Sequence, residues 1–264
     1  MDDSSPPQPE REKYRDRGNW AEGISTLKVT DVPEGAVNLN VEGRRPVGPL
    51  QGFGPLWQKT YRVRLEGCKI TPAEVVSMWK ANFQKFQPRQ NRFYPTRAGF
   101  NPGEVVLINA TMTGVPVDAG VVVLYADDES FTVMTPEGFP ESGFNSFSAY
   151  TDGDCTVVQI QSIARANDPI YELGFRMIGS RQQERIWKHV LTGIAAHYGI
   201  KAEVEMLKVC LDPKVQWSEA RNVWKNASVR SIIYVMATPV RRIRQMRRRR
   251  KPSHMRPTTR RPQR

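Results

Sequence analysis

The stretch "CTVVQIQSIARANDPIYELGFRMIGSRQQERIWKHVLTGIAAHYG" (residues 155–199) changes its hydrophobic period halfway along. Residues 155–166 are rich in Val and Ile, which is typical of a β-strand. After them Asp168 is placed to cap a helix and Pro169 to open it, and no further proline comes before Gly199. The stretch therefore predicts a strand followed by one long helix of about 45 Å.

One face of this predicted helix is apolar. Its members recur at helical spacing and are Ile186, Trp187, Val190, Leu191, Ile194 and Tyr198. Gly174, Gly179 and Gly193 weaken the helical propensity, so a kink near Gly179 is expected. We expect the apolar face to pack against the strands that come before it.

Four more segments rich in Val, Ile, Phe and Tyr precede this stretch. They are residues 104–112, 119–127, 130–135 and 143–150. The links between them are short and carry Gly, Pro and Asp. Because parallel strands need long crossover connections, these short links predict an antiparallel meander.

An earlier strand is predicted at "WQKTYRVRL" (residues 57–65). Its residues alternate, with Tyr61, Val63 and Leu65 on one face and basic residues on the other. This alternation is typical of a half-buried strand.

A helix is predicted to follow this strand. Thr71 and Glu74 form a capping box, and Pro72 suits the first helical position. The apolar stripe of this helix is Val75, Met78, Trp79, Phe83 and Phe86.

The order of these elements predicts an α+β fold of the helix-grip class, in which a curved antiparallel sheet wraps around a long C-terminal helix. Residues 52–200 are expected to form this domain. Residues 1–51 are expected to be a disordered lead-in and an extended arm, since the first 19 residues lack large aliphatic side chains and the rest is rich in Gly and Pro. Residues 201–240 are expected to be a partly helical extension, and residues 241–264 a disordered, arginine-rich tail.

Part of the sequence resembles an uncharacterised family of START-like proteins, the domain of unknown function numbered nineteen-ninety. The resembling motifs are Gly138, Pro140, Glu141, Gly143, Phe147, residues 181–185, and "GFGPLWQKTYRVRL" (residues 52–65). The resemblance covers roughly residues 50 to 200 and does not extend to the arginine-rich tail. It implies the helix-grip fold of polyketide cyclases, lipid-transfer domains and pollen allergens, and it implies no established activity.

The loop "TPEGFPESGF" (residues 135–144) has two interpretations. Gly138 and Gly143 permit positive φ, Pro140 stiffens the crossing, and Glu141 can bond local amides, all of which suit a structural turn. The same residue types would suit a catalytic loop. The structural turn is favoured, and it is also placed to form the mouth of a pocket.

Several functional classes lack their sequence signatures. Cys68, Cys155 and Cys210 lie far apart, which argues against a zinc site or a disulfide framework. We find no Ser elbow, HExxH, phosphate-binding loop or Rossmann fingerprint, and we expect neither a metal nor a cofactor. No signal peptide or membrane-spanning segment is evident, so a cytoplasmic location is expected. Peripheral association with the inner face of the membrane is a further expectation.

Residues 155–166 place different side chains on their two faces. One face carries Val157, Gln159, Gln161 and Ile163, and the other carries Val158, Ile160, Ser162 and Ala164. The second face is the more uniformly apolar, so we expect it to point toward the long helix.

The leading functional hypothesis is noncatalytic binding of a hydrophobic small molecule or lipid between the sheet and the long helix. The residues expected to contact it are Trp79, Phe83, Phe147, Val158, Ile160, Trp187, His189 and Leu191. The same side chains suit a plain hydrophobic core. A second hypothesis is a cyclase-like or hydrolase-like enzyme with His189 or Glu172 as acid or base.

The net charge of +12 lies in the C-terminal tail. Residues 241–264 contain eleven arginines, one lysine and no acid, and therefore also carry +12, so the remainder of the chain is neutral. Apolar residues at helical spacing precede the tail, and such a basic amphipathic segment predicts contact with an anionic membrane surface or a nucleic acid. The expected anion-binding residues are Arg241, Arg242, Arg244, Arg247, Arg248, Arg249, Arg250 and Lys251. A solvated tail without a partner is the third interpretation.

Overall fold

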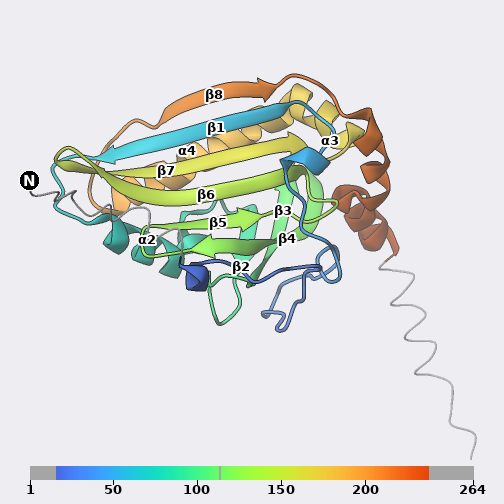
Figure 1. The fold of residues 1–264 in the computed structure, drawn as a ribbon, viewed down its shortest axis with the longest axis horizontal. Helices are drawn as coiled ribbons and strands as arrows, with labels where there is room; N and C mark the ends of the chain where they lie inside the picture. The colour runs from blue at the N-terminus through green and yellow to red at the C-terminus, as the bar shows by residue number, and fades with distance from the viewer. Residues whose placement is uncertain (1–15, 113, 238–264) are drawn as a thin grey trace, which may run out of the picture.

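The protein folds around an eight-stranded antiparallel sheet that curves over one long helix (Figure 1). A computed structural model describes residues 16–112 and 114–237. The sheet order is β2-β3-β4-β5-β6-β7-β1-β8. The strands are β1 (Leu56–Leu65), β2 (Asn91–Tyr94), β3 (Val105–Met112), β4 (Val115–Ala126), β5 (Ser130–Met134), β6 (Glu141–Asp152), β7 (Cys155–Ala166) and β8 (Glu205–Asp212). The α+β helix-grip prediction is confirmed.

The order of the strands separates β1 from its neighbours in sequence. β1 lies between β7 and β8, so the first strand of the chain pairs with the last two. Tyr61 of β1 stands opposite Ile160 on one side and Met206 on the other.

The helices lie on the concave side of the sheet and at its end. They are α2 (Pro72–Ala81), the short η3 (Phe83–Phe86), α3 (Pro169–Gly174), the π-helical η4 (Phe175–Gly179) and α4 (Ser180–His197). Two short 3-10 helices, η1 (Arg17–Asn19) and η2 (Pro49–Gln51), belong to the N-terminal arm. The predicted capping box of α2 is confirmed: Glu74 donates its backbone N–H to the Thr71 hydroxyl, and its carboxylate accepts from the Thr71 backbone N–H at 2.8 Å.

The prediction of one continuous helix after Asp168 needs a correction. The helix is divided by the π-helical turn η4, which runs from Phe175 to Gly179. Gly174 precedes this turn and Gly179 is its last residue. Both glycines have low helical propensity and so weaken the regular α-helical hydrogen bonding there. The kink expected near Gly179 therefore takes the form of a wider turn.

Two strands were not expected. β2 is four residues long and β8 exposes most of its side chains, so neither has a clear apolar alternation. β8 comes from the segment expected to be partly helical, and it extends the sheet beyond residue 200. The rest of that segment does contain helix: η5 (Trp217–Lys225) and a helix at residues 227–237.

The hydrophobic core fills the space between the sheet, α2 and α4. Phe131 and Phe147 stack with ring centroids 4.8 Å apart, and Trp79 meets Phe147 edge-on at 5.4 Å. Val158 and Ile160 are fully buried in this core, which confirms the predicted inner face of β7.

Residues 16–51 cross the outer face of the sheet as an extended arm. Leu27 and Val41 are buried there in a second apolar cluster, with Leu107 of β3 and Val122 of β4. An isolated bridge joins Trp20 to Tyr125. The arm thus covers strands that would otherwise expose apolar side chains.

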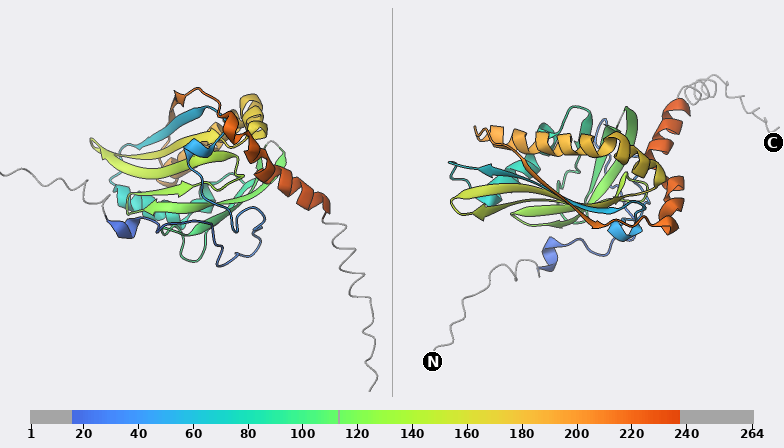
Figure 2. Two further views of the ribbon diagram at one scale, coloured as in Figure 1. Left: turned by 45° about the vertical axis from the view of Figure 1, so that its right-hand side comes forward. Right: turned by 90° about the horizontal axis from the view of Figure 1, so that it is seen from above.

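The helix at residues 227–237 begins on the body and points away from it (Figure 2). Ala227 and Ser231 are buried, whereas Ile232, Ile233, Val235 and Met236 are exposed. Within residues 16–112 and 114–237, no helix is long and apolar enough to cross a membrane.

Candidate ligand pocket

An apolar cavity lies between the sheet and α4, with a volume of about 120 Å³. Strands β2 to β6 supply its floor, and η3, η4 and α4 its roof. Its apolar lining is Phe83, Phe93, Phe100, Val106, Ile108, Ala110, Val121, Val133, Phe139, Pro140, Phe147, Phe175, Ile186 and Trp187. Its polar lining is Asn91, Thr111, Glu141, Asn145, Gln182 and Gln183.

Aromatic rings hold the walls of the cavity in place. Phe83 packs edge-on against Phe93 at 5.1 Å and against Phe147 at 5.6 Å, and Phe147 meets Trp187 at 5.7 Å. Such edge-to-face contacts favour fixed ring positions. The cavity is therefore shaped by interlocked rings from three different elements.

Two buried polar atoms of the cavity lining lack hydrogen-bond partners within the part of the chain that the structure describes. They are the Asn145 side-chain oxygen on β6 and the Trp187 indole nitrogen on α4. A buried polar atom without a partner costs about 1–3 kcal/mol. Both atoms have almost no accessible surface, so a bound molecule would reach them only after a shift of the lining side chains.

The cavity ends in a polar cluster of Lys59 from β1, Glu141 from β6 and Gln183 from α4. Gln183 accepts a hydrogen bond from the Lys59 ammonium and donates one to the Glu141 carboxyl at 2.8 Å. Burial raises the pKa of Glu141, and the nearby Lys59 charge and the Gln183 hydrogen bond oppose that effect only in part. Burial likewise lowers the pKa of Lys59.

A second, more polar pocket of about 360 Å³ adjoins this cluster. It shares Glu141 and Phe175 with the apolar cavity, and Lys59 lines it. Its other lining residues are Pro55, Trp57, Ser162, Ala164, Arg165, Ala166, Glu172, Arg176 and Lys208. The polar cluster therefore stands at the partition between an apolar and a polar compartment.

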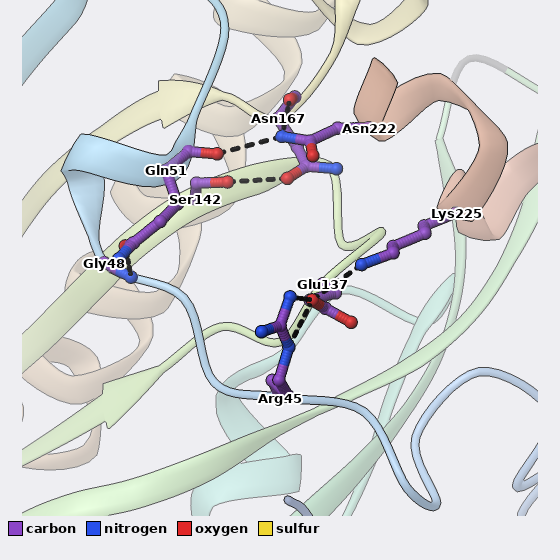
Figure 3. A network of polar contacts seen from close by, with 8 residues as sticks. All are labelled: Arg45, Gly48, Gln51, Glu137, Ser142, Asn167, Asn222 and Lys225. Carbon is purple, nitrogen blue, oxygen red and sulfur yellow. Dashed lines mark hydrogen bonds and ion pairs between the residues drawn. The ribbon is translucent and has the colours of Figure 1, made fainter. Parts of the chain in front are cut away.

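The loop at residues 135–144 is a structural junction and also reaches the pocket. Figure 3 shows Arg45 of the arm and Lys225 of η5 reaching Glu137 from two sides, both at 2.7 Å from the same oxygen. Ser142 donates to the Asn167 side chain at 2.6 Å. The end of the loop then lines the cavity through Phe139, Pro140 and Glu141.

The structure distributes the predicted ligand residues over three environments. Phe83, Phe147 and Trp187 line the apolar cavity. Trp79, Val158, Ile160 and Leu191 are buried in the core without lining it. His189 is corrected: it is exposed on α4, two residues from the buried Trp187, and that spacing turns it away from the sheet.

The predicted anion-binding residues all belong to the C-terminal tail. Arg241, Arg242, Arg244, Arg247, Arg248, Arg249, Arg250 and Lys251 lie outside the described residues.

Sequence reasoning missed the polar cluster. The basic residues of β1 were expected on the outer face, but Lys59 has the same parity as Tyr61 and Val63 and therefore points inward. That parity was a usable signal. Gln183 precedes Trp187 by four residues and Val190 by seven, so it shares their face of α4, but nothing in the sequence pairs it with Glu141.

No protein-family model matches the chain, and no curated protein is similar to it at the sequence level. Solved structures resemble it at low sequence identity. A START superfamily protein from Mycobacterium smegmatis is 14% identical with a TM-score of 0.38, over 55% of this chain and 99% of that one. The major latex-like protein 151 from Panax ginseng is 17% identical with a TM-score of 0.37, over 55% and 98%. The di-domain StfQ from the steffimycin biosynthetic pathway is 9% identical with a TM-score of 0.41, over 55% and 53%.

At identities of 9% to 17% and TM-scores of 0.37 to 0.41, these similarities carry no information about a ligand or a reaction. By its own geometry, the chain is a helix-grip protein with a small apolar cavity that ends in a buried polar cluster.

Proposed function

We propose that the protein binds a small hydrophobic compound in the cavity between the sheet and α4 and carries out no reaction on it. The observation that supports this most is the cavity of about 120 Å³ with its aromatic walls. In a well-packed interior, voids larger than a water molecule are few. Asn145 and Trp187 also line this cavity, and each has a buried polar side-chain atom without a partner among the described residues.

The volume favours a compact ligand over a lipid with two acyl chains. An apolar cavity of about 150 Å³ holds one benzene molecule. A cavity of about 120 Å³ therefore suits one aromatic ring or a short branched chain.

Filling the cavity should abolish this binding. Ala110 lines the cavity on β3, and A110F adds a ring into the space. We expect the dissociation constants of toluene and phenol, measured by ligand-observed NMR, to rise at least tenfold. In A98F, a matched substitution at an exposed loop position, we expect no change.

Native mass spectrometry of the full-length protein, followed by solvent extraction, would identify a ligand that copurifies. Equal affinity of the two probes for A110F and A98F would overturn the proposed site. So would the absence of any probe binding to the unaltered protein.

An enzymatic role would have to rest on residues other than His189. His189 is exposed on α4, and Glu172 is paired with Arg176 at 2.6 Å beside the polar pocket. Glu141 is the acid that touches the apolar cavity, and burial raises its pKa, as a general acid requires. Lys59 is joined to Glu141 only through Gln183, and the described residues that line the apolar cavity include no nucleophile paired with a base, so binding is favoured over catalysis.

A second proposed role is association with an anionic membrane surface through the C-terminal helix. Ile233 and Met236 are 59% and 73% exposed, and the arginine-rich segment follows them in the sequence. Anionic lipid would contact both features, whereas a nucleic acid would use only the arginines. The exposed apolar side chains therefore favour lipid.

We expect the full-length protein to bind vesicles that contain phosphatidylglycerol and to ignore vesicles of phosphatidylcholine alone. Burying an apolar side chain contributes about 1.5–3 kcal/mol, so the double variant I233S/M236S should weaken this partition at least tenfold. V209S, at an exposed position on β8, is the control and should leave partition unchanged. Equal sedimentation of I233S/M236S and V209S with the anionic vesicles would refute the proposal, as would tighter binding to duplex DNA than to lipid.

A further inference from the structure

Lys59 carries a buried charge whose hydrogen-bonding capacity is mostly unused. Its side chain starts from the inner face of β1, and the residue is only 7% exposed. Its one hydrogen bond within the described chain goes to the neutral Gln183 side chain. Over residues 16–112 and 114–237, no carboxylate oxygen lies within 4.0 Å of its ammonium group. An ammonium has three donors, so two remain for another group.

Glu141 stands on the other side of the same Gln183. Its carboxyl accepts from the Gln183 amide at 2.8 Å and is 9% exposed. Burial favours its neutral form, and a neutral carboxyl group can donate a hydrogen bond. Gln183 therefore holds the Lys59 amine and the Glu141 carboxyl at fixed positions on its two sides.

Both groups lie where the two compartments meet. Gln183 and Glu141 line the apolar cavity, and Glu141 and Lys59 line the polar pocket. A molecule that fills the apolar cavity with a ring and carries an acidic group on a short chain would place that group at this partition.

A purely structural role explains the cluster poorly. A buried charge loses its hydration, and well-packed apolar residues of similar volume are often as stable or more stable in its place. Lys208, the cross-strand neighbour of Lys59, shows the ordinary alternative: it is exposed, and its ammonium lies 4.1 Å from the centre of the Trp57 ring.

We propose that the ligand is an amphipathic monocarboxylate, whose apolar body occupies the cavity and whose carboxylate is bound by Lys59 and Glu141. This inference rests on the proposed binding function and names its ligand class. The Lys59 ammonium provides the charge-assisted hydrogen bond, which is about twice as strong as a neutral one. When it is protonated, the Glu141 carboxyl donates the second hydrogen bond.

The test uses acids and their uncharged counterparts. Benzoate, phenylacetate, 3-phenylpropionate and 4-phenylbutyrate are each titrated into the full-length protein at pH 7.5, beside their primary amides, by isothermal titration calorimetry. The series varies the spacing between the ring and the carboxylate. We expect at least one acid to bind tenfold or more tightly than its amide.

The variants K59M and K69M separate the buried lysine from an exposed one. Both remove one positive charge, but Lys69 lies in an exposed loop after β1 and lines neither pocket. K59M should remove the preference for the acid and retain the binding of the amide, and it should not lower the melting temperature. K69M should retain the preference.

Each outcome has a definite meaning. Equal binding of acid and amide at every chain length would overturn the carboxylate site and leave the apolar binding function intact. An acid preference that survives in K59M would also overturn it. If neither acids nor amides bind, the binding function fails, and the carboxylate site fails with it.

Discussion

The variant G138A is expected to destabilise the protein by at least about 3 kcal/mol, measured as the loss in free energy of unfolding by urea. Gly138 has φ +83°, a conformation that costs other residues about 1–2 kcal/mol. A Cβ atom there would also overlap the backbone carbonyl oxygen of Lys225. The clash displaces η5, which weakens the hydrogen bond from Ala227 N–H to the Gly138 carbonyl at 2.9 Å.

Gly153 provides the matched control for this prediction. It has φ +60° in the hairpin between β6 and β7, and a Cβ atom there would meet nothing within 4 Å. G153A should therefore cost only the conformational term, about 1 kcal/mol. If G138A and G153A are equally stable, the contact between the loop and the C-terminal segment does not contribute as described.

The variant D168A is expected to lower the free energy of unfolding by about 3 kcal/mol. Asp168 is fully buried and accepts from the backbone N–H groups of Ile170 and Tyr171, at 2.8 and 3.0 Å, which caps α3. It also accepts from the buried Asn226 amide at 2.8 Å. Alanine would remove the cap and leave that amide unpaired.

Thr71 gives the comparison for an exposed cap. It precedes a proline-initiated helix, as Asp168 does, but its hydrogen bonds with Glu74 are exposed. T71A should therefore cost about 1 kcal/mol. A cost for D168A no greater than that for T71A would show that the link to Asn226 adds nothing, and chemical denaturation of both variants decides this.

The elements that sequence reasoning predicted well have strong local signals. Asp168 and Thr71 were identified as caps because a cap needs only a short polar side chain and a few residues around it. The inner face of β7 followed from its alternation, since Val158 and Ile160 share a side.

What could not be predicted depends on positions that only the fold brings together. Lys59, Glu141 and Gln183 are separated by 82 and 42 residues in the sequence, and no local pattern links them. Likewise β8 exposes most of its side chains, so its place in the sheet is set by backbone pairing with β1. Small differences in side-chain packing decide whether an apolar residue lines the cavity or belongs to the filled core.

The position of β1 between β7 and β8 has a consequence for the growing chain at the ribosome. Tyr61 can pair with Ile160 only after another 99 residues have been synthesised, and with Met206 later still. Until then at least one edge of β1 has no partner strand. At translation rates of about 5–20 residues per second, synthesis of the chain from Tyr61 to Ile160 takes roughly 5–20 s. During that time β1 offers two open edges and an apolar face to other nascent chains, so this strand is where a chaperone that shields exposed strands would have most effect on yield.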